Sequence, residues 1–254
     1  MRAIILSAGQ GKRLLPLTAQ TPKCLLPVQD ESSLLDFQLC TLAACGIDEV
    51  SVLVGFGAAQ VEEALATRRH AGLAVRTVYN PFYAQSDNLA TAWLARAEMN
   101  EEFLLVNGDT LFTEEVLARL LASQDAPLTL AINVKDRYDD DDMKVSLADD
   151  RHLTAVSKRL PPETVDGESI GLMLFRRDGA TAFRAALESA IRQPEALRLW
   201  YLSVIDGLAA SLRIETTNIT GMWWGEIDDL EDLTEVRKTL SVSHPSETRT
   251  SSLE

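Results

Sequence analysis

Apolar and polar positions alternate along the first half of the chain in blocks that predict strands and helices in turn. Short apolar or β-branched runs predict buried strands, and apolar residues spaced three and four apart predict helices. The expected strands are residues 3–7, 49–54, 74–79 and 103–107. The expected helices are residues 34–45, 60–67 and 88–97. This rhythm favours an α/β fold with a doubly wound, mostly parallel sheet and helices on both faces.

The second half has a more mixed pattern that predicts a small, partly antiparallel section of the same Rossmann-like sheet. The expected strands are residues 128–133, 144–147, 153–157, 170–175, 212–217 and 222–227. The expected helices are residues 180–192, 197–211 and 229–240. Residues 241–254 are rich in Ser and Thr without periodicity, which predicts a disordered tail. We therefore expect one domain over residues 1–240.

Composition narrows the class of protein. A length of 254 residues is ample for a core, and a net charge of −14 argues against nucleic-acid binding. The chain has no apolar run long enough for a membrane span and starts without a signal-peptide pattern, so we expect a cytoplasmic protein. The three cysteines lack CxxC spacing and predict neither a disulfide nor a zinc site. Cys24 follows Lys23, so a lowered thiol pKa is an alternative to a buried apolar role.

The loop after the first expected strand carries the strongest candidate chemistry. Residues 9–13 are Gly-Gln-Gly-Lys-Arg, and Lys23 follows ten residues after Arg13. Glycines let the backbone approach an anion and point N–H groups at it, and the cations neutralise phosphate charge. The pattern indicates a nucleoside triphosphate site. It has neither P-loop spacing nor the third glycine of a dinucleotide fingerprint, and Gly-x-Gly alone is also typical of a tight strand-to-helix turn.

Two aspartates at strand ends are candidate metal ligands. Asp109 ends the apolar run of residues 104–109, and Asp228 ends the strand-like run of residues 223–228. In a parallel sheet such positions face the ligand crevice. Mg²⁺ usually takes one or two protein carboxylates, whereas the alternative for each aspartate is a helix N-cap. We expect Mg²⁺ as the cofactor.

The motif Ala-Gly-x-Gly-x-Arg-Leu-x-Pro-Leu-Thr, followed by Thr-Pro-Lys, resembles the signature of the sugar-phosphate nucleotidylyltransferases. This resemblance covers about 20 positions and implies catalytic roles for Arg13, Lys23 and Lys158, with Asp109 and Asp228 holding the metal. It divides the domain into a nucleotide-binding part at about residues 1–125 and an acceptor-binding part at about residues 126–240. The predicted nucleotide-binding residues are Leu6, Ser7, Ala8, Gly9, Gly11, Lys12, Arg13, Lys23, Ser86, Asn88 and Gly108.

The acceptor site is predicted mainly by the same resemblance. Relatives place a lysine near Lys158 on the acceptor phosphate, and an acidic-to-glycine segment like residues 168–171 beside it. The predicted acceptor-binding residues are Asp109, Lys144, Lys158, Glu168, Gly171 and Trp224. The chain departs from the family pattern at Asn107, where many relatives have an acidic or small residue. Glu226 could compensate for the missing charge or point into solvent.

The segment Ser-Asp-Asn at residues 86–88 resembles cytidylyltransferases that act on phosphocholine, aminoethylphosphonate or inositol phosphate. We therefore expect transfer of CMP from CTP to a small phosphorylated acceptor. The alternatives are a hexose-1-phosphate uridylyl- or thymidylyltransferase and a nucleotide-sensing subunit without turnover. The acidic residues 139–142 are typical of a solvated loop, and the aromatic residues Trp200, Tyr201, Trp223 and Trp224 are typical of a core. As an alternative, the two groups together could bind a cationic head group. The oligomeric state stays open, a homodimer included.

Overall fold

Strands and helices alternate through the described part of the chain, which in this computed structural model comprises residues 1–68, 72–123 and 125–243. The strands are β1 (Arg2–Ser7), β2 (Pro27–Gln29), β3 (Ser32–Ser33), β4 (Glu49–Val54), β5 (Ala74–Tyr79), β6 (Glu102–Asn107), β7 (Thr110–Phe112), β8 (Leu128–Asn133), β9 (Lys144–Leu147), β10 (Leu153–Ser157), β11 (Gly167–Arg176), β12 (Ile214–Asn218) and β13 (Trp224–Glu226). The α-helices are α1 (Leu34–Ala44), α2 (Ala58–Thr67), α3 (Asn88–Leu94), α4 (Glu114–Leu121), α5 (Arg177–Ala190), α6 (Leu202–Leu208) and α7 (Leu230–Ser243).

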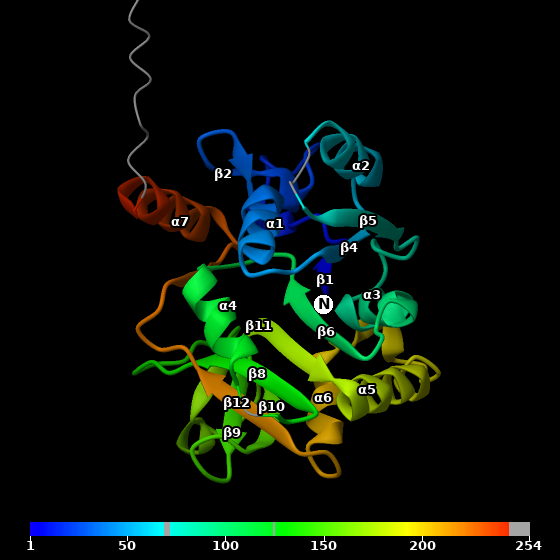
Figure 1. The fold of residues 1–254 in the computed structure, drawn as a ribbon, viewed down its shortest axis with the longest axis vertical. Coiled ribbons are helices and arrows are strands. Elements are labelled where there is room, and N and C mark those ends of the chain that lie inside the picture. The colour runs from blue at the N-terminus through cyan, green and yellow to red at the C-terminus, as the bar shows by residue number, and fades with distance from the viewer. Residues whose placement is uncertain (69–71, 124, 244–254) are drawn as a thin grey trace, which may run out of the picture.

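A nine-stranded mixed sheet forms the centre of the molecule (Figure 1). In its first half, β1 lies between β6 and β4, β4 pairs with β5, and all these pairs are parallel. In its second half, β11 pairs antiparallel with β6, β8 and β9, and β12 lies parallel to β8. The topology confirms the expected α/β fold with a mostly parallel mixed sheet and a partly antiparallel second section.

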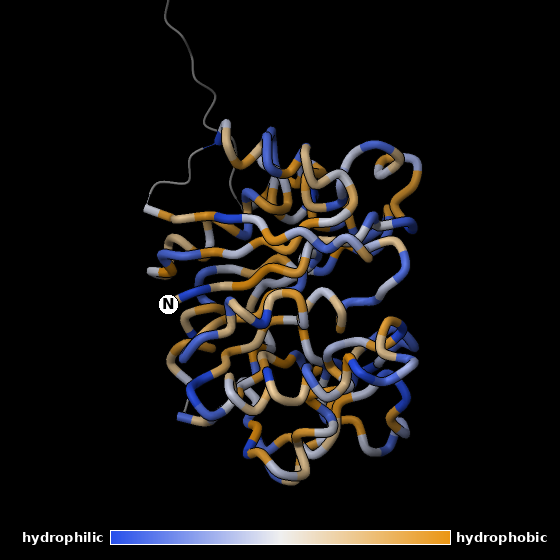
Figure 2. Tube along the Cα trace, turned by 90° about the vertical axis from the view of Figure 1, so that its right-hand side faces the viewer, coloured by the Kyte–Doolittle hydropathy of each residue, from blue (hydrophilic) through white to orange (hydrophobic). Residues whose placement is uncertain are grey.

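Helices cover both faces of this sheet because successive strand residues point to opposite sides. On β6, Phe103 and Leu105 pack into one hydrophobic cluster, and Leu104 and Val106 pack into the other. The first cluster includes residues of α3, α5 and α6, and the second includes residues of α1 and α4. Figure 2 shows hydrophobic residues concentrated along the central strands.

A third hydrophobic cluster connects the C-terminal helix to the first loop. Leu233 and Val236 of α7 pack in the same cluster as Leu14 and Ile227. Helix α7 thereby supports the segment that follows β1. The helix continues through Ser243, three residues past the expected end, and residues 244–254 of the expected tail lie outside the described residues.

The expected helix of residues 197–211 is wrong in its first half. The structure has a short 3-10 helix, Ala196–Arg198, then an extended residue, and α6 begins only at Leu202. The backbone N–H of Asp87 donates to the carbonyl of Leu197, and that of Leu89 donates to the carbonyl of Leu199. These tertiary hydrogen bonds hold the segment against the start of α3. Among the described residues, no helix has the length and apolar character needed to cross a membrane.

Candidate active site

The loop after β1 is closed on itself by hydrogen bonds. Gly11 has a φ of 73° and precedes the 3-10 helix Lys12–Leu14, and the Thr18 hydroxyl donates to its carbonyl at 2.7 Å. A Cβ on Gly11 would lie 3.0 Å from Cδ of Lys23, in a backbone conformation that side chains rarely adopt. Glycine at this position therefore lets the loop turn and lets Lys23 pass close beneath it.

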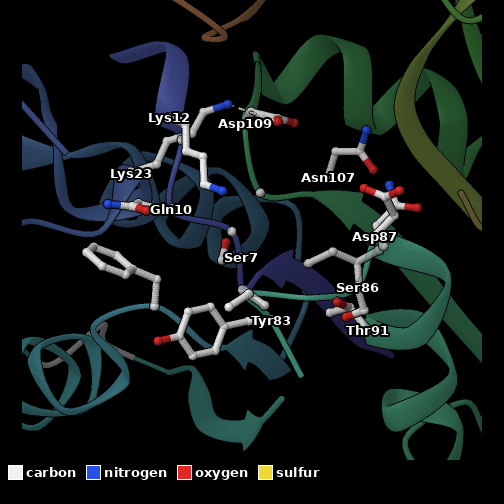
Figure 3. A pocket seen from close by; sticks show the side chains of 18 of the residues that line it. Ser7, Gln10, Lys12, Lys23, Tyr83, Ser86, Asp87, Thr91, Asn107 and Asp109 are labelled. Carbon is white, nitrogen blue, oxygen red and sulfur yellow. Dashed lines mark hydrogen bonds and ion pairs between the residues drawn. The ribbon is translucent and has the colours of Figure 1, made fainter. Parts of the chain in front are cut away.

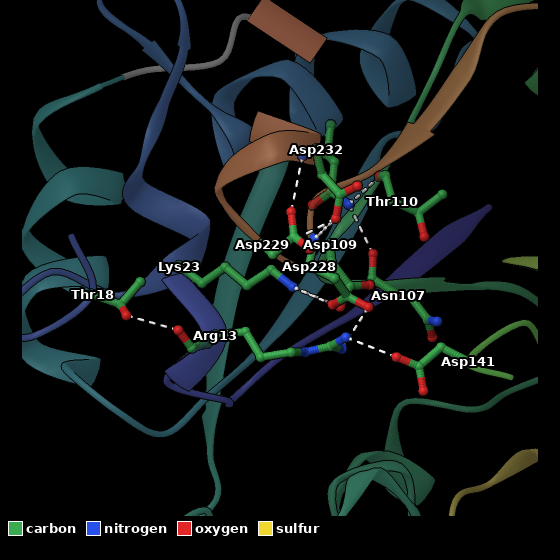
Figure 4. A network of polar contacts seen from close by, with 12 residues as sticks. Arg13, Thr18, Lys23, Asn107, Asp109, Thr110, Asp141, Asp228, Asp229 and Asp232 are labelled. Atoms are coloured by element: carbon green, nitrogen blue, oxygen red, sulfur yellow. Dashed lines mark hydrogen bonds and ion pairs between the residues drawn. The ribbon is translucent and has the colours of Figure 1, made fainter. Parts of the chain in front are cut away.

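Lys23 and Arg13 meet two carboxylates at the edge of the sheet (Figure 4). Lys23 Nζ lies 3.0 Å from Asp109 Oδ2 and 3.1 Å from Asp228 Oδ1. Arg13 Nη2 lies 2.7 Å from Asp228 Oδ2. Burial opposes the charge of Lys23, but both carboxylates outweigh it and raise the lysine pKa. Burial likewise opposes ionisation of Asp228, but Lys23 and Arg13 outweigh it and lower the pKa of that carboxyl.

A short two-stranded sheet brings the two aspartates together across 119 positions of sequence (228 − 109). β7 directly follows Asp109 and pairs antiparallel with β13, which ends two residues before Asp228. The N–H of Ile227 donates to the carbonyl of Asp109 at 3.1 Å. Asp109 itself follows Gly108, where any Cβ would lie 2.4 Å from the carbonyl oxygen of Leu6. The glycine therefore allows the turn after β6 to pack against β1.

A third carboxyl group completes a candidate metal centre. One oxygen from each of Asp109, Glu226 and Asp228 lies within 4.8 Å of the other two. Desolvation, followed by the negative charges of Asp109 and Asp228, raises the pKa of Glu226 to about 8. Glu226 is exposed as a residue, but its carboxyl is crowded by these neighbours. Asp109 Oδ1 is buried and accepts no hydrogen bond from any residue that the structure describes. Crowded carboxylates with a free buried oxygen fit a hard divalent cation such as Mg²⁺.

A cavity of about 790 Å³ opens beside these charged groups (Figure 3). Every residue that the sequence predicts to bind the nucleotide lines it, together with Asp109 and Asp228. Several further residues line the cavity that the sequence did not predict to bind the nucleotide: Gln10, Phe56, Tyr83, Gln85, Thr91, Leu197, Arg198 and Trp200. Leu197 and Arg198 have no recognisable signal for ligand binding in the sequence, because their spacing predicts a regular helix over residues 197–211.

A second, adjoining groove contains the basic residue predicted for the acceptor. Lys158 lines this groove, and its Nζ lies 4.5 Å from the centre of the Trp200 ring. Trp200 lines both cavities and so marks where they join. Asp139 and Asp140 also line the groove. One aromatic residue and part of the acidic run are therefore side by side, whereas Trp223 packs edge-to-face against Phe37 at 6.1 Å elsewhere.

The other residues predicted for the acceptor have different surroundings. Lys144 is buried at the groove and donates to the backbone carbonyls of Asp139 and Lys158. Glu168 is buried with an ion pair to Lys135 and lines neither cavity. Trp224 packs against the hydrophobic cluster of α1 and α4, away from both cavities. The structure therefore gathers Lys158 and Lys144 at the groove but not Glu168 or Trp224.

Asn107 has a fixed amide at the end of β6. Its Oδ1 accepts a hydrogen bond from the hydroxyl of the buried Tyr201 at 2.8 Å. A Cβ on Gly171, whose φ is 75°, would lie 2.4 Å from Nδ2 of Asn107. Gly171 thus makes room for this amide and does not itself line either cavity. The departure from the family pattern at Asn107 places a neutral donor at the wall of the nucleotide cavity.

Cys24 does not have the environment of a reactive thiol. It is buried, and desolvation raises its pKa to about 12 despite the neighbouring Lys23. A reactive cysteine needs a lowered pKa and solvent access. The structure therefore favours the apolar role over the redox alternative.

Comparisons with known proteins show the family of the chain. Residues 2–140 match the family model described as nucleotidyl transferase. The chain is 31% identical to CMP-5'-(3-aminopropyl)phosphonate synthase of Streptomyces rubellomurinus, over 91% of this chain and 37% of that protein. It is 33% identical to choline-phosphate cytidylyltransferase of Streptococcus pneumoniae, over 44% of this chain and 46% of that protein. The matches thus span less than half of either relative.

Among solved structures, the inositol-1-phosphate CTP transferase of T. maritima superposes with a TM-score of 0.78 at 18% identity. The superposition covers 94% of this chain and 96% of that chain, which shows a shared fold. The family model covers more than half of the sequence and includes the first loop and Asp109. The chain belongs to the nucleotidyl transferase family.

Proposed function

We propose that the chain transfers CMP from CTP to a small phosphorylated alcohol or phosphonate and releases pyrophosphate. One observation carries this proposal: four charged side chains from three distant segments meet beside one cavity, and these are Arg13, Lys23, Asp109 and Asp228. A cavity of about 790 Å³ is within the usual range for a small-molecule site. The similarity to two proteins named for CMP or cytidylyl chemistry supports CTP as the donor.

The first loop and its cations would bind the triphosphate. Backbone N–H groups near Gly9 and Gly11 can approach phosphate oxygens closely because neither residue has a side chain. Arg13 offers a planar fork of donors, and Lys23 offers a compact charge from below the loop. Asp109 and Asp228 would hold Mg²⁺, which would neutralise negative charge on the phosphates.

The reaction needs positioning more than proton transfer. A phosphate monoester has a second pKa of about 6, so the acceptor oxygen is already ionised and needs no general base. That oxygen forms a bond to the α-phosphorus. The bond between the α-phosphorus and the oxygen that bridges it to the β-phosphorus breaks, and pyrophosphate leaves with the electron pair. Lys158 would hold the acceptor phosphate. Arg13 would stabilise the negative charge on the phosphate oxygens during the transfer.

We further propose that residues 1–125 supply most of the nucleotide site and residues 126–240 most of the acceptor site. The lining of the two cavities supports this division. Two later segments would also contribute to the nucleotide site, because Trp200 and Asp228 line its cavity, and Trp200 lines the groove of the acceptor as well.

The variant Asp109→Asn tests the proposal at its centre. It keeps the shape of the side chain but removes a charge from the pair with Lys23 and from the metal centre. We expect pyrophosphate release from CTP to fall about 100-fold or more with an unchanged circular dichroism spectrum. The control Asp150→Asn removes an exposed carboxylate that lines a different cavity and should keep full activity. Near-normal turnover of Asp109→Asn would exclude Asp109 from the reaction.

A further inference from the structure

The acidic segment between β8 and β9 reaches across the proposed substrate site. We call residues 139–142 the acidic strap. The Asp141 carboxylate contacts two cations at once, with Oδ2 3.1 Å from Arg13 Nη1 and Oδ1 3.7 Å from Lys158 Nζ. Figure 4 shows Asp141 facing the guanidinium of Arg13. In the proposed function, Arg13 binds the phosphates of the nucleotide and Lys158 binds the phosphate of the acceptor.

The two ends of the strap are held firmly. Asp142 pairs with Lys135 at 2.8 Å, and Lys135 pairs in turn with the buried Glu168 at 2.8 Å. The backbone N–H of Asp139 donates to the Asp142 carboxylate at 2.6 Å. The carbonyl of Asp139 also accepts from Lys144, which is itself buried. These contacts hold the strap at the groove and involve neither Arg13 nor Lys158.

The tip of the strap is different because its contacts face solvent. The Asp141 side chain is 71% exposed, and that of Arg13 is 55% exposed. Exposed ion pairs are individually weak and are screened by salt. A ligand phosphate, which carries more charge and more acceptor oxygens than a carboxylate, can therefore displace Asp141.

We propose that Asp141 is an internal substitute for a ligand phosphate. In the free protein its carboxylate occupies Arg13 and Lys158, and a phosphate-bearing ligand must displace it in order to bind. The anchored strap thus makes an autoinhibitory contact that weakens binding and keeps both cations in place between turnovers. The identity of the displacing ligand rests on the proposed function, whereas the competition between carboxylate and phosphate does not.

The test compares two neighbouring asparagine variants. Asp141→Asn removes the negative charge that pairs with Arg13 and Lys158. Asp140→Asn removes the same formal charge one residue away, and within the described part of the chain the Asp140 carboxylate makes no ion pair or hydrogen bond. Isothermal titration with CTP and Mg²⁺ measures Kd for both variants and the wild type. A second titration with inorganic pyrophosphate and Mg²⁺ measures the phosphate contribution without the nucleoside.

We expect Asp141→Asn to bind both probes about two- to tenfold more tightly than the wild type, as the loss of two ion pairs of an exposed carboxylate implies. Asp140→Asn should show a clearly smaller change, and high salt should reduce the difference between Asp141→Asn and the wild type. Equal or weaker binding by Asp141→Asn relative to Asp140→Asn would overturn the inference. If the wild type binds pyrophosphate but does not bind CTP, the result counts against the proposed function and not against the role of Asp141. If neither the wild type nor any variant binds either probe, the result contradicts both the proposed function and the role of Asp141.

Discussion

Lys23 is expected to stabilise the fold as well as bind phosphate, and Lys23→Met separates these roles. The ammonium lies between Asp109 and Asp228, and only 12% of its side chain is exposed. The substitution keeps most of the apolar stem but removes the charge. Three carboxyl groups would then share one site without the cation that lies between the two aspartates, and only Arg13 would still pair with Asp228. We therefore expect the free energy of unfolding to fall.

The size of this effect follows from the geometry. The carboxyl oxygens lie within 4.8 Å of one another, and two like charges at that limit repel by about 3.5 kcal/mol at an effective dielectric constant of about 20. Solvent reaches 27% of each aspartate side chain, so the net cost is lower. Exposed pairs contribute up to about 1 kcal/mol, and breaking a buried pair costs about 3–5 kcal/mol. We therefore expect Lys23→Met to lower the free energy of unfolding by about 2 kcal/mol without Mg²⁺.

Urea unfolding followed by tryptophan fluorescence measures this loss, first in EDTA and then with Mg²⁺. The control Lys238→Met removes an exposed lysine on α7. Mg²⁺ should restore stability to Lys23→Met more than to the wild type, because the metal replaces the missing cation; binding at ten times Kd adds about 1.4 kcal/mol. The reasoning is refuted if Lys23→Met is as stable as the control in EDTA, or if Mg²⁺ stabilises both variants equally.

Three further outcomes test separate parts of the account. Lys158→Ala should raise KM for the acceptor about 10-fold or more, as loss of a charge-assisted hydrogen bond implies, and an equal rise for CTP would contradict this role. Cys24, with its pKa raised to about 12, should react with a disulfide reagent only after unfolding; three thiols reacting in the native protein would be the opposite result. Gly171→Ala should cost about 1–3 kcal/mol more in urea unfolding than Gly46→Ala, because both have positive φ but only the first clashes, with Asn107; equal losses would contradict the clash.

The central strands could be predicted from sequence because their local signals agree with the fold. The runs at β4, β5 and β8 begin and end where the structure has them, since they are rich in apolar and β-branched residues and each lies next to a turn residue, Gly55, Asn80 or Pro127. Helix α4 was missed although Thr113 precedes it and Val116, Leu117 and Leu120 form its buried side. That spacing is the ordinary helical signal and was available.

Other features depend on contacts between distant segments and have no local signal. Residues 199–201 leave the expected helix because the backbone around them bonds to the start of α3, and this brings Trp200 to both cavities. The proximity of Asp109 and Asp228 depends on the β7–β13 pair, and β7 was not expected. The acidic residues 139–142 are recognisable in the sequence, but nothing in their spacing indicates which of the four contacts Arg13 and Lys158. In the structure this residue is Asp141.

Pyrophosphate release with Mg²⁺ tests the central claim most directly. The wild-type chain is combined with each of CTP, UTP, dTTP, ATP and GTP, and each nucleotide with phosphocholine, aminoethylphosphonate, inositol-1-phosphate and glucose-1-phosphate. The account predicts release with CTP and a small alcohol phosphate or phosphonate, together with an equal amount of the CMP-linked product. Release only with UTP or dTTP and glucose-1-phosphate, or nucleotide binding without any release, would contradict it.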